Sequence, residues 1–242
     1  VAEHTAPFET ATARHAGHAR FRLLFVGHSS WWWGHHAQVD PVASWLEMMG
    51  AAVEAAAGSP AARGADHGLW LEFGVGSGKT TVAITAQLGT LLGNSAVLHG
   101  FDSFQGLPSS WEHTKLEAGT FSTGGQVPEH LVGRPNVQVH VGLFSDTLGD
   151  LDRFGAAPVA FAHIDVDLFS SAVQVLDRIA CQLHPGTILV FDELVNYAGF
   201  ELSGEYRAWE HIAAKYEIRW DYAGIFWQQA VPVFVTERGA AC

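Results

Sequence analysis

The fold is decided by the stretch Glu72-Phe73-Gly74-Val75-Gly76-Ser77-Gly78. It follows an apolar strand pattern at 68–73 and precedes an amphipathic helix pattern at 79–92. Glycines at this junction let a ligand approach the backbone closely, and the N-terminus of the following helix adds partial positive charge. The stretch therefore predicts a ligand-binding turn, with a turn needed only for packing the helix on the strand as the simpler alternative.

Three ligand classes compete for this turn. A dinucleotide fingerprint requires a glycine where Lys79 stands. A phosphate loop fits Gly78-Lys79-Thr80, but it also requires a glycine at the position of Phe73. The carboxylate of Glu72 would repel a polyphosphate and would suit a cationic ligand. A nucleoside-triphosphate hydrolase stays open as an alternative.

Strand and helix patterns alternate on either side of the turn. Strand patterns cover 68–73, 96–102, 137–141, 159–165 and 187–192, and helix patterns start at Asp40 and cover 79–92, 170–183 and 204–216. This alternation predicts an α/β fold with a doubly wound, mostly parallel sheet and helices on both faces. The segments 218–227 and 231–236 have no helix between them, so we expect an antiparallel C-terminal strand pair.

We expect one domain over 40–242, preceded by an N-terminal extension over 1–39. The extension contains Trp31, Trp32 and Trp33, followed by His35 and His36. These residues predict either a lid over a planar acceptor or a cluster that packs against the body of the protein.

Composition restricts the partners. The chain of 242 residues has 13 Lys and Arg against 25 Asp and Glu, a net charge of −12, so a nucleic-acid partner is disfavoured. Each apolar stretch is interrupted before the ~18 residues of a membrane helix, so no membrane partner is expected. Only two cysteines, Cys181 and Cys242, argue against a disulfide framework and favour a cytoplasmic location. A small-molecule partner fits best, and nine Trp in an apolar chain permit a homo-oligomer.

Acidic residues end two strand patterns. Asp165 ends the pattern over 159–165, and Asp192-Glu193 stand at the end of the next strand pattern, with Asp192 27 residues after Asp165. One crossover helix between neighbouring parallel strands takes about that length, and both strand ends meet at the edge where such sheets bind ligands. Carboxylates gathered there need a cation, and an all-oxygen ligand set selects Mg²⁺. The alternative is a set of solvent-facing strand caps.

Two resemblances follow from these motifs. Glu72 to Gly78 resembles motif I of class I S-adenosylmethionine-dependent methyltransferases, whose cofactor is cationic. Together with Phe101 to Pro108, His163 to Ser171 and Asp192-Glu193 through Glu205, it is similar to the macrocin O-methyltransferase family. The resemblance implies a Rossmann-like class I methyltransferase domain that methylates a small-molecule hydroxyl, on a sugar or natural product, with S-adenosylmethionine and Mg²⁺. Cofactor-binding residues would be Glu72, Gly74, Gly76, Ser77, Gly78, Asp102 and Ser103, and metal ligands Asp165, Asp192 and Glu193.

The expected chemistry is in-line methyl transfer to a hydroxyl that the metal holds. Asp165 is the first candidate for the proton acceptor, and His163, two residues earlier on the same strand face, is the second. A protein that binds S-adenosylmethionine without catalysing transfer remains the third hypothesis.

Overall fold

The computed structural model describes residues 41–63, 67–195, 197, 199–223 and 231–239. Its α-helices are α2 (Pro41–Ala57), α3 (Lys79–Leu92), α4 (Phe144–Thr147), α5 (Phe169–Ile179) and α6 (Gly204–Lys215). Its strands are β1 (Leu69–Phe73), β2 (Leu98–Asp102), β3 (Val137–Val141), β4 (Val159–Ile164), β5 (Leu183–Phe191), β6 (Arg219–Tyr222) and β7 (Val231–Glu237). Short 3-10 turns occupy Pro60–Ala62, Gly93–Ser95, Glu129–Leu131, Leu148–Phe154 and Ala180–Gln182.

The seven strands form one sheet in the order β3-β2-β1-β4-β5-β7-β6. The first five strands are parallel, and β7 runs antiparallel to both β5 and β6. The predicted α/β class and the antiparallel C-terminal pair are therefore confirmed. The strand order reverses between β1 and β4, and in open sheets of this kind the crevice at such a reversal is the ligand site.

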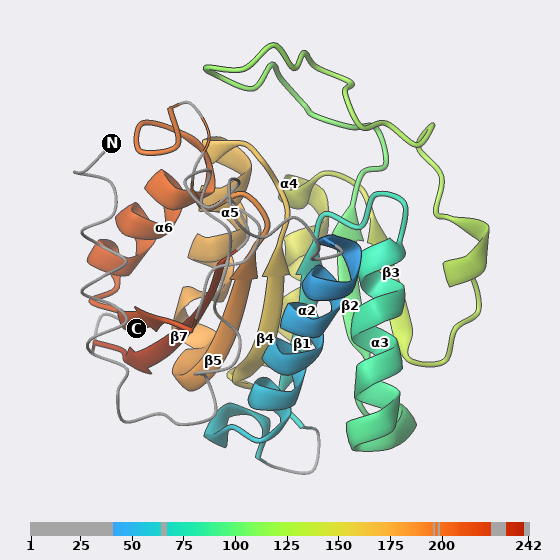
Figure 1. Ribbon diagram of the computed structural model, residues 1–242, viewed down its shortest axis with the longest axis vertical. Helices are drawn as coiled ribbons and strands as arrows, with labels where there is room; N and C mark the ends of the chain where they lie inside the picture. The colour runs from blue at the N-terminus through green and yellow to red at the C-terminus, as the bar shows by residue number, and fades with distance from the viewer. Residues whose placement is uncertain (1–40, 64–66, 196, 198, 224–230, 240–242) are drawn as a thin grey trace, which may run out of the picture.

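Helices cover both faces of the sheet, and Figure 1 shows α2 and α3 lying across one of them. Residues of β1, β4 and β5 supply the two cores, one on each face of the sheet. Trp70, Phe161 and Val190 pack with α2 and α3, whereas Leu71 and Leu189 pack with α5 and α6. The strands that carry the site are thus buried on both faces, which fixes the positions of their carboxyl ends.

The element ends depart from the sequence patterns where 3-10 turns intervene. The helix predicted at 170–183 ends at Ile179, because Ala180–Gln182 tighten into a 3-10 turn and β5 starts at Leu183. The strand predicted from 96 starts at Leu98, after a 3-10 turn over Gly93–Ser95. The expected extension over 1–39, with its tryptophan lid, lies outside the described residues.

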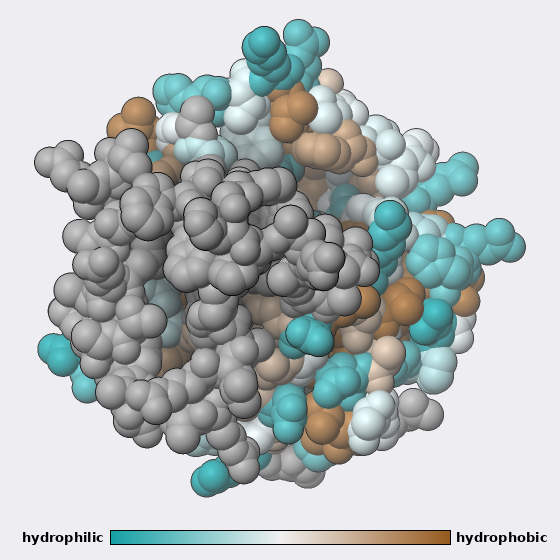
Figure 2. All heavy atoms as spheres, in the orientation of Figure 1, coloured by the Kyte–Doolittle hydropathy of each residue, from teal (hydrophilic) through white to brown (hydrophobic). Residues whose placement is uncertain are grey.

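The described surface bears on the expected partners. In Figure 2 hydrophobic and hydrophilic side chains are interspersed over the described part of one face. No described helix is both long and apolar enough to cross a bilayer.

Cys181 is not a free thiol, so the cysteines no longer support a reducing compartment.

Candidate active site

The glycine turn after β1 forms as predicted, and two of its glycines are required by the backbone. Gly74 has a φ of +88°, and a Cβ there would collide with the carbonyl oxygen of Asp165 at the end of β4. Gly78 has a φ of +75° and begins α3 in a left-handed conformation. Gly76 also has a positive φ, but nothing lies within 4 Å of its Cβ position. The turn is therefore tight against β4 and open at Gly76.

Asp102, at the end of β2, holds this turn in place. Its Oδ2 accepts hydrogen bonds from the backbone N–H of Val75 at 2.8 Å and of Gly76 at 2.7 Å. Its Oδ1 accepts the N–H of Phe104 at 2.6 Å. A carboxylate has about four acceptor positions, so roughly one remains for a ligand hydroxyl. Ser103, beside it, accepts the N–H of Gln105.

Glu72 lies inside the protein instead of at the mouth of the turn. Its side chain is fully buried, and Oε2 accepts the hydroxyl of Thr81, in the first turn of α3, at 2.6 Å. Its Oε1 lies 3.4 Å from Nδ1 of His163, its register neighbour on β4. The carboxylate of Glu72 has no exposed surface, so the structure does not place it in direct contact with a ligand. Its role would instead be to hold the shape of the turn.

His163 joins Glu72 to the acidic edge. Its ring is fully buried, with Nε2 3.9 Å from Oδ1 of Asp192. Burial by itself would lower the pKa of His163, but the interactions with Asp192 and Glu72 outweigh it and raise the pKa to about 10. The distances are those of ion pairs rather than of hydrogen bonds, and both ring nitrogens lack a hydrogen-bond partner in the described chain. His163 is therefore a buried imidazolium between two carboxylates.

Three carboxylates meet at the carboxyl edge of β4 and β5. Ligand oxygens of Asp165, Asp167 and Glu193 all lie within 4.8 Å of one another. The sequence predicted Asp165 and Glu193 for this site together with Asp192, but the structure brings Asp167 into the group and turns Asp192 towards His163. Asp167 takes this position because its backbone turns left-handed, with a φ of +59°, after β4 has ended.

The electrostatics of the cluster favour a cation among these carboxylates. Burial, then the charge of Asp192, raise the pKa of Asp167 to about 7. Burial and the neighbouring carboxylates also raise the pKa values of Asp165 and Glu193 well above their usual range. Oε2 of Glu193 is buried without a hydrogen-bond partner among the described residues. These all-oxygen ligands fit a hard divalent cation such as Mg²⁺.

Glu205, at the start of α6, supports the carboxylate cluster through hydrogen bonds to the backbone. The sequence pattern does not identify it as a site residue. Its side chain is fully buried, and Oε1 accepts the backbone N–H of Val166 at 2.9 Å. Oε2 accepts the N–H of Glu193 at 3.4 Å. Burial raises the pKa of Glu205 to about 8, against the effect of the Val166 hydrogen bond. One side chain thus ties together the ends of β4 and β5.

The sequence matches a known family, and the fold is shared with solved structures. The model of the methyltransferase domain family matches residues 71–194, just over half of the chain. The fold is similar to the crystal structure of CalS11, a calicheamicin methyltransferase, at 20% identity and a TM-score of 0.65 over 94% of this chain and 93% of that one. An apo structure of CalS11, described as a TDP-rhamnose 3'-O-methyltransferase, gives 20% identity and 0.57 over 79% of each chain.

The fold is also similar to the O-methyltransferase NovP, at 20% identity and a TM-score of 0.61 over 80% of each chain. No curated protein sequence matches the chain. The protein belongs to the methyltransferase domain family, and it is an S-adenosylmethionine-dependent methyltransferase. Lys79 and Thr80 are therefore first-turn residues of α3, and the interpretation as a nucleoside-triphosphate hydrolase is replaced.

Proposed function

We propose that this protein is a Mg²⁺-dependent O-methyltransferase that methylates a hydroxyl of a small molecule, on a sugar or a related natural product. One observation carries the proposal: Gly74 of the glycine turn packs directly against the backbone of Asp165 in the acidic cluster. The predicted cofactor turn therefore adjoins the predicted metal ligands at the carboxyl edge of the sheet. The solved structures CalS11 and NovP, both described as methyltransferases with the same fold, support the class of reaction.

The cofactor would lie on the turn at Gly76, where the backbone is open, beside the exposed Ser77. Asp102 would accept one ribose hydroxyl at its remaining acceptor position while it keeps holding the turn. Ser103 adds a hydroxyl at the same strand end. Glu72 and Thr81 contribute indirectly, because their hydrogen bond fixes the end of β1 to the start of α3.

When bound, S-adenosylmethionine supplies an electrophilic methyl group and Mg²⁺ supplies a Lewis acid that lowers the pKa of a hydroxyl. The protein's part is to position the acceptor. We assign Asp165 and Glu193 as metal ligands, and the geometry favours Asp167 over Asp192 as the third. Asp192 stays ionised beside them, because the charge of His163 outweighs burial and lowers its pKa.

The proton of the acceptor hydroxyl would pass to a carboxylate of this cluster. Asp165 is the candidate that the sequence favours for this role, and Asp167 lies in the same cluster. A carboxylate can use one oxygen as a ligand and the other as a base, so both roles are compatible. His163 is already protonated and has no exposed surface, so we propose that it positions Asp192 instead of accepting the proton.

A panel of hydroxylated glycosides and nucleotide sugars, incubated with S-adenosylmethionine, tests this function by mass spectrometry. A methylated product that forms with Mg²⁺, disappears in chelator and is lost in Asp165→Asn supports it. Asp146→Asn, in an exposed residue of α4, is the matched control and should behave as the parent protein. Methylation that persists in chelator and in Asp165→Asn would remove the metal from the proposal. A cytoplasmic location and a homo-oligomer remain predictions.

A further inference from the structure

We infer that the pocket between the starts of α5 and α6 binds a carboxylate or phosphate group of the methyl acceptor. This inference rests on the proposed function and adds the class of acceptor. The pocket has a volume of about 220 Å³, smaller than the roughly 300–1,000 Å³ of sites that enclose a whole ligand. It would therefore hold one group of the acceptor, not all of it.

Two long helices begin at this pocket. Phe169 and Ser170 open α5, and Ser203 and Gly204 open α6, and all four line the cavity. Neither helix has a side-chain hydrogen bond at its N-cap. The first N–H groups of a helix carry partial positive charge and bind anions when no side chain caps them. Two such ends on one pocket favour an anionic occupant.

Two buried hydrogen-bond donors belong to residues that line the pocket. The hydroxyl of Ser203 and the indole N–H of Trp111 have no hydrogen-bond partner in the described chain, although the two residues are only 3% and 7% exposed. A buried polar group without a partner costs about 1–3 kcal/mol, so native proteins rarely leave such groups unpaired. An oxygen-bearing group in the pocket would supply the partner that both donors lack.

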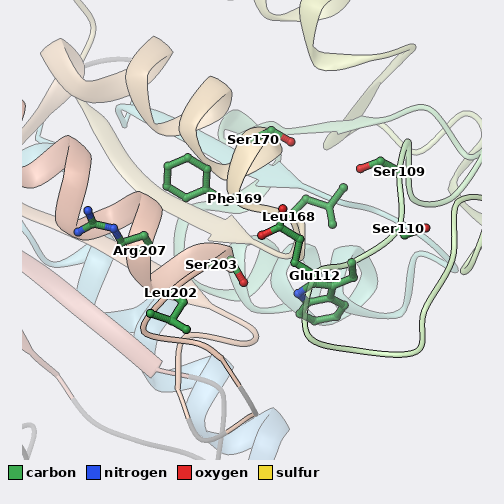
Figure 3. A pocket seen from close by; sticks show the side chains of 11 residues that line it. Ser109, Ser110, Glu112, Leu168, Phe169, Ser170, Leu202, Ser203 and Arg207 are labelled. Carbon is green, nitrogen blue, oxygen red and sulfur yellow. The ribbon is translucent and has the colours of Figure 1, made fainter.

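The outer lining suits an anion attached to a larger body. Figure 3 shows Ser109 and Ser110 on one side of the pocket and Arg207 on the other. The lining also includes one cation, Arg207, one carboxylate, Glu112, and the hydroxyls of four serines, Ser109, Ser110, Ser170 and Ser203. Phe169 and Leu202 are 39% and 71% exposed at the edge, where they would contact an apolar part of the acceptor.

The pocket is close to the reacting end of the site. Leu168 in its wall directly follows Asp167, and Gly204 directly precedes Glu205. Successive Cα atoms are about 3.8 Å apart, so an acceptor anchored here would have its neighbouring atoms beside the acidic cluster. The anion would then fix which hydroxyl reaches the methyl donor.

The test is a titration of the ¹⁵N-labelled protein with inorganic phosphate and, separately, with acetate. The indole N–H signal of Trp111 is assigned by its absence in Trp111→Phe. We expect that signal to shift saturably as the anion is added. Ser203→Ala should weaken anion binding about tenfold, as the loss of one hydrogen bond to a charged group implies. Tighter binding of phosphate than of acetate would indicate a phosphorylated acceptor, and tighter binding of acetate would indicate a carboxylated one. Ser145→Ala, in an exposed serine of α4, should bind as the parent does.

The inference is overturned if neither anion moves the Trp111 signal, or if Ser203→Ala binds both as tightly as the parent protein. A purely structural Ser203 would give that second result, because its hydroxyl bonds to nothing in the described chain. Calorimetric binding of S-adenosylhomocysteine in the same sample separates the two proposals. Cofactor binding without anion binding removes only this inference, whereas anion binding without cofactor binding removes only the proposed function.

Discussion

Replacing Asp167 by Asn should make the metal-free protein more stable at pH 8, not less. In the fold the pKa of Asp167 rises from 3.8 to about 7, first through burial and then through the charge of Asp192. At ~1.36 kcal/mol per pH unit, this difference makes ionised Asp167 cost about 4 kcal/mol of stability. Asn is well suited to the left-handed backbone at this position, with its φ of +59°, so the substitution should add little strain of its own.

The pH dependence has a definite sign. A carboxyl group whose pKa is higher in the folded than in the unfolded protein binds more protons when folded, so its contribution to stability falls as pH rises. For Asp167 the loss should run from about pH 4 to about pH 7. The parent protein in chelator should therefore lose stability across this window, and Asp167→Asn should lose less, by up to about 4 kcal/mol.

Urea unfolding at pH 5 and pH 8, with chelator and with Mg²⁺, measures this effect. Mg²⁺ should stabilise the parent protein at pH 8, by about 2.7 kcal/mol at 100 times its dissociation constant, and should stabilise Asp167→Asn less. Equal pH dependence in the two proteins would refute the repulsion argument. Equal stabilisation by Mg²⁺ would show that Asp167 is not a ligand.

Three further changes test other parts of the site. Gly74→Ala should severely destabilise or abolish the fold, because its Cβ would meet the backbone of Asp165 at the end of β4. Gly89→Ala, in open space within α3, should instead raise the free energy of unfolding by about 0.5–1 kcal/mol. Thermal melts that rank the two variants otherwise would contradict the packing. Glu72→Gln should lower the free energy of unfolding, measured in urea, by about 3–5 kcal/mol, because it leaves the His163 imidazolium with one carboxylate partner. A change smaller than about 0.5 kcal/mol would disprove the buried ion pair. Asp102→Asn should weaken the binding of S-adenosylhomocysteine, measured by calorimetry, at least about tenfold, because an amide cannot accept all three backbone N–H groups. Unchanged affinity would show that the turn does not need the carboxylate of Asp102.

The features that sequence predicted well are those that a local pattern encodes. Gly74 and Gly78 were identified because a strand, a glycine run and a helix follow one another directly in the chain. Asp165 and Glu193 were predicted to meet because parallel strands bring their carboxyl ends to one edge, and the structure brings them together. Both inferences need only the order of the elements, not their detailed packing.

The features that sequence could not give depend on packing between distant segments. Asp167 joins Asp165 and Glu193 through one left-handed residue beyond β4, which no periodicity encodes, while Asp192 lies beside His163. Glu205 reaches the site from α6, some forty residues after Val166, whose N–H it accepts. His163 lies beside Glu72 only because β1 and β4 are neighbours in the sheet and in that register.

The central claim, that a methyl donor and a divalent ion bind side by side at this edge of the sheet, is tested most directly by titrating Mg²⁺ into the protein saturated with S-adenosylhomocysteine. We expect one ion per chain in the parent protein, and none in an Asp165→Asn variant that still binds S-adenosylhomocysteine with unchanged affinity. The account is contradicted if Mg²⁺ binds equally well to both proteins, or if S-adenosylhomocysteine does not bind at all.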